Sequence, residues 1–170
     1  MNKQELLARL DYFNLVHGVT VRAVDAFGDD ELDFRPKAGM RTPRELVFHV
    51  YTQEKTLAEA ARQGEFTFEM ANRSNPEDQS AAATLSALLT VIDLRAYANT
   101  CHDAAERNFR AMSDEEVARL IASPFGTYPA WQYLLFAYDE HWHHRGQLYT
   151  YLRLLGKQPP MLYDYQAAES

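Results

Sequence analysis

The feature that most constrains the fold is a helical spacing of apolar residues that recurs in four long stretches of the chain. In residues 2–26, apolar side chains follow one another at steps of three and four, which is typical of one face of an amphipathic helix. The same spacing recurs in residues 42–63, about 80–112 and 129–155. No segment alternates convincingly with period two, as a half-buried strand would. The sequence therefore predicts an all-α fold and a single domain over residues 1–170.

Capping residues and helix breakers mark where these helices begin and end. Thr42-Pro43-Arg44-Glu45 is a capping box with proline at the first helical position. Ser113-Asp114-Glu115-Glu116 is a second capping box, which predicts a short extra helix to about Ile121 before the last long helix. Gly156 suits the end of that last helix, and Pro159-Pro160 prevents its continuation.

The connections between the predicted helices are long enough for a bundle. Residues 28–41 and 64–79 contain glycine, proline and polar residues, so we expect both to be irregular. The second connection is long enough to cross a bundle. Four amphipathic helices joined in this way predict a four-helix bundle, a fold that accepts metal sites built from side chains on facing helices.

Charge and cysteine content exclude several classes of function. The formal net charge is −7, whereas binding to a nucleic-acid backbone needs a basic surface, so we expect no nucleic-acid partner. The single cysteine, Cys101, cannot form an internal disulfide. The N-terminal residues form no apolar signal segment, and the weakly polar stretch 81–92 is too short to span a membrane. We therefore expect a cytoplasmic protein with no membrane partner.

Three of the six histidines fall within residues 139–147. Glu140 and His144 are spaced i,i+4 and so share one face of the last helix, in a row that is otherwise apolar. A carboxylate that faces a bundle core is costly unless it is paired or metal-bound. His49 is the only histidine on the inward face of the second helix.

These three residues predict a metal site formed by His49, Glu140 and His144. Two imidazoles and one carboxylate leave coordination positions open on Zn, Ni, Mn or Fe(II). Open positions suit a catalytic or substrate-binding ion rather than a closed structural one. Glu140 could instead pair with an arginine such as Arg145 or Arg153, and His49 or His144 could be a hydrogen-bonded core histidine.

Neighbouring residues supply alternatives for the same site. His141 could replace Glu140 as a ligand if the last helix is rotated or locally bulged. His143, Gln53 and Arg145 are candidates for a supporting position around the ligands, with His143 equally consistent with the surface. Three further residues have plainer interpretations: His17 as a core or pocket histidine, His102 as a surface residue, and Cys101 as a small buried apolar residue.

Several short motifs resemble those of a known family. They are Glu-Leu-Val-Phe-His-Val at 45–50, His-His-Arg-Gly-Gln-Leu at 143–148, Tyr-Leu-Arg-Leu-Leu-Gly at 151–156, and Pro159-Pro160, together with Phe34-Arg35-Pro36 in the first connection. In this order and over nearly the whole chain, they resemble the DinB/YfiT-like superfamily of metalloenzymes, which is unrelated to the DNA polymerase of similar name.

The resemblance implies an up-down-down-up four-helix bundle, often dimeric, with a divalent metal held by three histidines. By motif, His49 is the ligand from the second helix, and His144 is the second histidine of the His-His-Arg-Gly segment. The remaining family position, four residues before His144, is Glu140 here. This departure implies a preference for harder ions or weaker occupancy.

The resemblance also implies an activity. Characterised relatives include transferases that use bacillithiol or mycothiol, and mycothiol-dependent maleylpyruvate isomerases. Their metal lowers the pKa of a bound thiol and presents a thiolate to an electrophile. We therefore expect a divalent-metal-dependent enzyme, a small-molecule substrate, a low-molecular-weight thiol as second substrate, and a homodimer. The alternatives are a metal-assisted hydrolase and a non-catalytic metal- or ligand-binding bundle dimer linked to stress.

Overall fold

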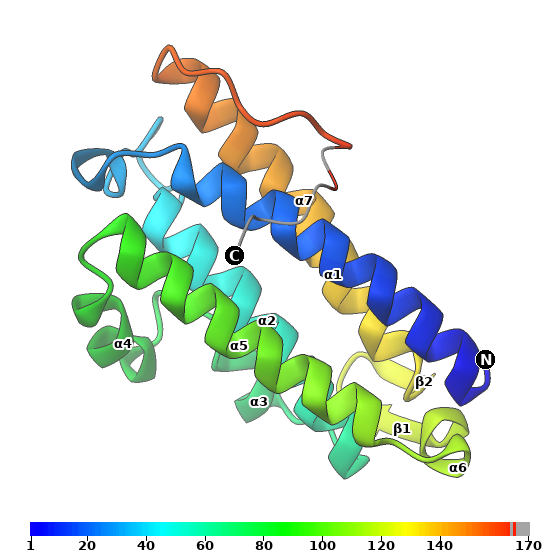
Figure 1. Cartoon of the computed structure of the whole chain (residues 1–170). Helices are drawn as coiled ribbons and strands as arrows, with labels where there is room; N and C mark the ends of the chain where they lie inside the picture. The colour runs from blue at the N-terminus through cyan, green and yellow to red at the C-terminus, as the bar shows by residue number, and fades with distance from the viewer. Residues whose placement is uncertain (164, 166–170) are drawn as a thin grey trace.

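Four long helices form an up-down-down-up bundle in the computed structural model, which describes residues 1–163 and 165 (Figure 1). They are α1 (Lys3–Asp25), α2 (Pro43–Gln63), α5 (Val91–Ala111) and α7 (Gln132–Leu154). Both α1 and α2 pack against α5 and α7, and α2 and α5 run in the same direction. The predicted all-α four-helix bundle is confirmed.

Local chemistry sets the ends of these helices. The Thr42 side chain accepts a hydrogen bond from the Glu45 backbone, and the Glu45 side chain accepts one from the Thr42 backbone, so the predicted capping box at the start of α2 is present. Gly64 ends α2 in the left-handed conformation (φ +84°), which glycine adopts without steric cost.

The prediction of one long helix over residues 80–112 is wrong, because this stretch forms two separate α-helices. A 3-10 turn (Gln79–Ala81) leads into the short α4 (Ala82–Ala87), and Leu88 then leaves the helical conformation (φ −89°, ψ 70°). The Thr90 side chain accepts from the Asp93 backbone and starts α5 anew. The connection before it, expected to be irregular, also contains the short α3 (Phe68–Asn72).

A β-hairpin that the sequence pattern does not predict stands between α5 and α7. The short helix α6 (Asp114–Ala118) ends at Ala118, three residues before the predicted end at about Ile121. The chain then forms β1 (Leu120–Ser123) and β2 (Gly126–Pro129), which pair antiparallel. A further 3-10 turn, Asp29–Glu31, lies between α1 and α2. Strands of four residues are too short to show a period, so the hairpin left no clear signal.

The apolar core falls into two clusters with a polar layer between them. One cluster contains Phe13, Leu57, Phe109 and Leu134, and the other contains Leu46, Val50, Leu94 and Leu152. On every long helix, buried polar residues lie between the two clusters; they include Thr20, Glu54, His102, His141 and His144. We call these residues the polar layer.

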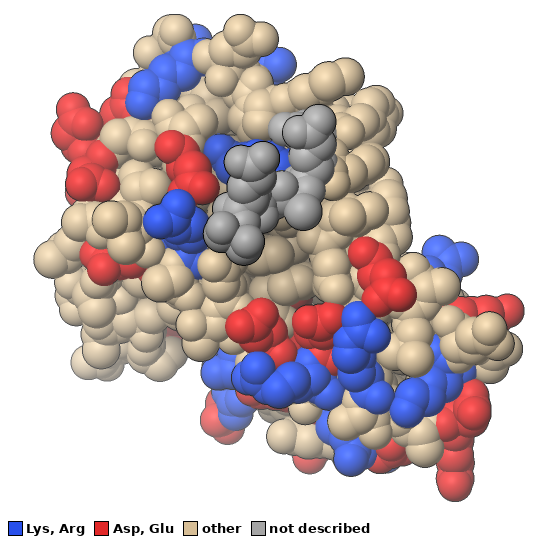
Figure 2. Space-filling model, viewed as in Figure 1, with Lys and Arg blue, Asp and Glu red and all other residues tan. Residues whose placement is uncertain are grey.

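Two further features of the described residues concern surface charge and helix hydropathy. On the face shown in Figure 2, basic and acidic side chains lie interspersed rather than in a uniform basic field. Arg110, for example, pairs with both Asp11 and Glu106. Among the described residues, no helix is both long enough and apolar enough to cross a membrane.

Candidate metal centre

The three predicted ligands meet where α2 faces α7. Nε2 of His144 lies 3.1 Å from the Glu140 carboxylate, and Nε2 of His49 lies 3.4 Å from the same oxygen, Oε2. The two imidazole rings are 4.8 Å apart and nearly perpendicular, at 85°. In the described part of the chain, this trio is the one group of ligand-type side chains whose donor atoms all lie within 4.8 Å of one another.

Hydrogen bonds on the far side of each ring fix which nitrogen faces the centre. Nδ1 of His49 donates to the backbone carbonyl of Ser74 (2.7 Å), and Nδ1 of His144 donates to the side-chain oxygen of Gln147 (2.7 Å). Both partners are carbonyl oxygens, which can only accept, so Nδ1 carries the proton in each ring. In the neutral tautomer, Nε2 therefore presents a lone pair to the centre.

This donor set suits a divalent cation. Two imidazole nitrogens and one carboxylate oxygen converge, and their lone pairs repel one another unless protons on Nε2 or a metal ion lie between them. Hydrogen bonding to His144 and then to His49 outweighs the opposing effect of burial and holds the pKa of Glu140 well below its usual range, so the carboxylate is ionised. Ligand histidines held through their second nitrogen are the usual arrangement at protein metal sites.

The predicted supporting residues divide into two groups. Gln53 accepts a hydrogen bond from Ser74 Oγ (2.6 Å), so it steadies the residue whose carbonyl holds His49. His143 is exposed and packs its ring against that of His144, 4.6 Å away. Arg145 does not support the trio: its guanidinium donates to the carbonyl of Val16 and stacks 4.2 Å over Trp142.

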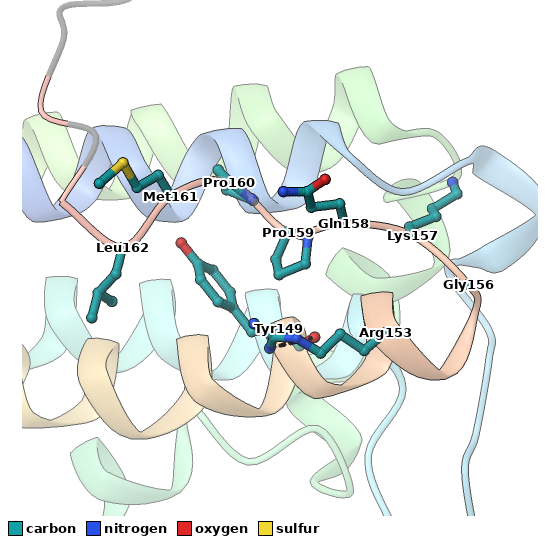
Figure 3. A pocket seen from close by; sticks show the side chains of 9 residues that line it. All are labelled: Tyr149, Arg153, Gly156, Lys157, Gln158, Pro159, Pro160, Met161 and Leu162. Carbon is teal, nitrogen blue, oxygen red and sulfur yellow. Dashed lines mark hydrogen bonds between the residues drawn. The ribbon is translucent and has the colours of Figure 1, made fainter.

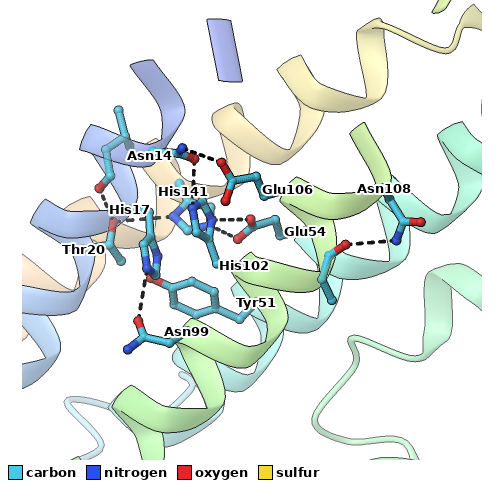
Figure 4. Close-up of polar contacts among 12 residues, drawn as sticks. Asn14, His17, Thr20, Tyr51, Glu54, Asn99, His102, Glu106, Asn108 and His141 are labelled. Atoms are coloured by element: carbon cyan, nitrogen blue, oxygen red, sulfur yellow. Dashed lines mark hydrogen bonds and ion pairs between the residues drawn. The ribbon is translucent and has the colours of Figure 1, made fainter. Parts of the chain in front are cut away.

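His141 also lies outside the trio, in the centre of the polar layer (Figure 4). It is fully buried, and its Nε2 donates to Glu54 (2.9 Å) rather than facing Glu140. The other oxygen of Glu54 accepts from Nδ1 of His102 (2.7 Å). The expectation that His102 is a surface residue is wrong, because its exposed fraction is 4%.

Both ring nitrogens of His102 face acceptor oxygens. Asn14 donates its amide to Glu106 (2.9 Å), so its carbonyl oxygen faces Nε2 of His102 (3.0 Å). Nδ1 of His102 and the Glu54 carboxylate, 2.7 Å apart, form a buried pair.

Two pKa values in this layer depart strongly from their usual range. Burial alone would raise the pKa of Glu54, but hydrogen bonds from His102 and His141 have the larger combined effect and lower it to about 2. Burial, followed by the charge of His102, lowers the pKa of His17 to about 3. The neutral His17 ring stacks on His102 at 3.8 Å and bonds to Tyr51 and Asn99.

Three partners of these histidines were not identified from the sequence: Ser74, Gln147 and Glu54. Gln147 is spaced i,i+3 from His144, and Glu54 continues an apolar helical row with Val50 and Leu57, so both left a signal that could have been used. Ser74 left none, because the connection that brings its carbonyl to His49 has no periodic pattern.

Two hollows lie on different parts of α7. The larger, about 880 Å³, lies between α7 and residues 156–162; Figure 3 shows Tyr149 and Arg153 beneath that segment, and none of the three candidate ligands lines it. The smaller, about 390 Å³, includes Gln53 and Glu140 in its lining and so adjoins the candidate metal centre.

Comparisons with known proteins agree with this fold. The family model described as the DinB family matches residues 1–170. A search of curated proteins found no match. Among solved structures, a DinB-like protein from Bacillus subtilis has a TM-score of 0.69 and 20% identity, over 94% of this chain and 98% of that one. A mycothiol-dependent maleylpyruvate isomerase has a TM-score of 0.65 and 19% identity, over 87% of this chain and 63% of that one.

Proposed function

The chain belongs to the DinB family, and from this premise we propose that it is a divalent-metal-dependent enzyme that transfers a low-molecular-weight thiol to a small electrophile. His49, Glu140 and His144 are its metal ligands in this proposal. The ion is Zn, Ni, Mn or Fe(II), since two imidazoles and one carboxylate suit each of these.

One observation carries the metal assignment. Nε2 of His49 and Nε2 of His144 both face Oε2 of Glu140, while each Nδ1 is held by an acceptor-only oxygen. The two rings are thereby set in the tautomer that a metal requires before any ion arrives.

The chain's own residues contribute orientation and charge. A bound ion would act as a Lewis acid that lowers the pKa of a coordinated thiol. Ser74 and Gln147 hold the two imidazoles in place, so little reorganisation is needed on binding. Glu140 reduces the positive charge of the centre relative to three neutral imidazoles. The centre therefore acidifies a bound thiol less than a centre with a third histidine would.

The thiol is the class of second substrate that the comparisons favour. The isomerase with a similar fold is named as mycothiol-dependent, which supports a thiol as a reactant. This chain spans 63% of that protein, so its maleylpyruvate substrate is not carried over. A metal-assisted hydrolase uses the same ligands, and the experiment below separates the two reactions.

The test begins with elemental analysis of protein purified without a histidine tag. The metal-loaded protein is then incubated with 1-chloro-2,4-dinitrobenzene alone. In parallel reactions, bacillithiol, mycothiol or glutathione is added to the same mixture. We expect about one divalent ion per chain, and a loss of thiol that equals the loss of electrophile. His49→Ala and His144→Ala should lose both metal and turnover, because each removes one imidazole ligand.

The matched control is His143→Ala, which removes an exposed histidine beside His144 and should keep metal and activity. If His49→Ala and His144→Ala both retain stoichiometric metal, the site lies elsewhere. Ester substrates cleaved without any thiol, by a reaction lost in the same two variants, would replace the transferase by the hydrolase. Metal binding with neither reaction would leave a binding protein.

A further inference from the structure

An aromatic-lined cavity of about 390 Å³ adjoins the candidate metal centre. It lies between the β1–β2 hairpin, the residues just after α2 and the first half of α7. Its size falls within the range of sites for small organic molecules. Its apolar walls consist mainly of five aromatic rings: Phe66, Phe125, Tyr128, Tyr133 and Phe136.

The rings of this cavity support one another edge to face. Tyr128 packs at 90° on Phe136 (5.1 Å), and Tyr133 bridges Phe136 (5.7 Å) and Phe66 (5.8 Å). Such pairs are stabilising beyond the area they bury, so the walls are held in place before a ligand arrives. Preformed apolar walls are typical of a binding site rather than of a packing defect.

Exposed aromatic rings cluster at the mouth of the cavity. Phe125, at the tip of the hairpin, has an exposed fraction of 59%. It leans on Phe66 (6.1 Å) and on Phe68 (5.8 Å), which is itself 64% exposed. Clustered exposed rings beside a hollow mark an interaction site more often than isolated ones do.

The polar end of the cavity is the metal centre. Glu140 and Gln53, a ligand and a supporting residue in the proposed function, are part of its lining, and Asp139 stands on its rim. Among the described residues that line it, the charged ones are Asp139 and Glu140, both acidic. In the metal-free chain, a carboxylate placed among the rings would meet repulsion from these two groups, and no basic residue lines the described part of the cavity.

We propose that this cavity binds an uncharged aromatic group of the co-substrate, with its reactive end directed to Glu140. The substrate class is therefore a small aromatic electrophile rather than an aliphatic dicarboxylate. The reactive end rests on the proposed function, whereas binding of the aromatic group rests on the cavity alone.

The test measures binding without turnover. 2-Naphthamide, an uncharged aromatic probe, is titrated by calorimetry into metal-loaded and metal-free protein. We expect saturable binding to both. Phe125→Ala should weaken it at least fivefold, and Leu120→Ala, which removes an equally exposed side chain (68%) of the same hairpin outside the cavity, should leave it unchanged.

Charge is tested with 2-naphthoate on metal-free protein, because an ion at the centre would itself attract the carboxylate. We expect the naphthoate to bind at least fivefold more weakly than the amide, and Asp139→Lys to abolish that difference. Absence of saturable 2-naphthamide binding, equal losses in Phe125→Ala and Leu120→Ala, or equal affinity of the wild-type chain for both probes would overturn the proposal. Failure of the metal assignment alone would leave 2-naphthamide binding intact.

Discussion

At the scale of single residues, the proposed metal centre makes a prediction about Glu140. It supplies the one charged donor, to which Nε2 of both imidazoles is directed. Glu140→Ala should lower the affinity for Zn and Mn by about 100-fold or more, because even supporting residues of metal sites contribute 10- to 100-fold. Glu140→His should retain metal and shift the preference towards Zn, a softer ion than Mn. Calorimetric titration of both variants with both metals measures this.

The control for that experiment is the neighbouring histidine. His141→Ala should keep metal affinity, because its Nε2 donates to Glu54 and not to the trio. It should nevertheless lower the free energy of unfolding by about 3 kcal/mol, because Glu54 loses a buried partner. If His141→Ala loses metal while Glu140→Ala keeps it, the assignment of ligands on α7 is wrong.

Glu54 and His17 together make the stability of the protein sensitive to acid. The folded-state pKa is lowered in both, to about 2 for Glu54 and about 3 for His17. The unfolded chain therefore binds more protons, so the free energy of unfolding falls as the pH falls. The contribution of His17 begins to be lost below its unfolded pKa of about 6.5, and that of Glu54 below about 4.5. Urea unfolding of metal-free protein between pH 7 and pH 3 measures both stages.

The variant that isolates the first stage is His17→Gln. It removes the group that titrates between about pH 6.5 and about pH 4.5 in the unfolded chain, so the loss of stability over that range should become smaller than in the wild type. The second stage, below about pH 4.5, should persist because Glu54 is unchanged. An identical pH profile for the two proteins would show that His17 is protonated equally in the folded and unfolded chains.

At the scale of elements, the side chain of Arg119, just before β1, contacts the end of α2. The Arg119 guanidinium donates to the carbonyls of Ala61 and Arg62, which are among the last of α2. The guanidinium passes so close to Gly64 that a Cβ added at Gly64 would lie 2.7 Å from Cζ of Arg119. Gly64 also has a φ of +84°. A side chain at position 64 therefore meets both backbone strain and a clash.

Gly64→Ala should lower the free energy of unfolding by about 2 kcal/mol, measured by urea denaturation. Gly156→Ala is its control, because Gly156 also has a positive φ (+76°) after a long helix, but a Cβ added there would have no heavy atom within 4 Å. It should cost about 1 kcal/mol, from the backbone conformation alone. Equal losses in the two variants would mean that Arg119 moves aside freely.

Capping residues made an element predictable only where no apolar spacing ran across them, and elements fixed by tertiary packing could not be predicted. Thr42 and Glu45 mark the start of α2 by local hydrogen bonds, which the sequence displays directly. Thr90 and Asp93 form the same kind of box, but the helical spacing of Leu85, Leu88 and Ile92 runs across it and suggests an unbroken helix. The hairpin owes its form to pairing between two short segments, which no period reveals.

The candidate site divides in the same way. Glu140 and His144 could be paired because i,i+4 spacing is a property of one helix, and His49 because it is alone on its inward face. Ser74 reaches His49 from a connection, and His102 reaches Glu54 from another helix; both contacts depend on how elements meet. Sequence reasoning about His102 was wrong for that reason.

At the scale of the whole molecule, the two apolar clusters are complete without the metal centre. One joins α1, α2, α5 and α7 through residues such as Leu10, Leu57 and Phe109, and the other joins the same helices at the opposite end of the bundle. The layer between them holds its own buried pair, Glu54 with His102. An ion would therefore add to a core that already exists, unlike the ion of a zinc finger, without which no core forms.

Removal of metal should lower the melting temperature without abolishing folding. A ligand that binds the folded chain at about 100 times its Kd adds about 2.7 kcal/mol, which corresponds to about 5–10 °C for a domain of this length. Circular dichroism at 222 nm, recorded on heating with and without a chelator, should show a single cooperative transition in both cases. The variant His49→Ala should melt at the same temperature with and without chelator, because it has no ion to lose. A loss of helical signal at room temperature on chelation would contradict the prediction, since it would mean that the two clusters cannot hold the helices together without the ion.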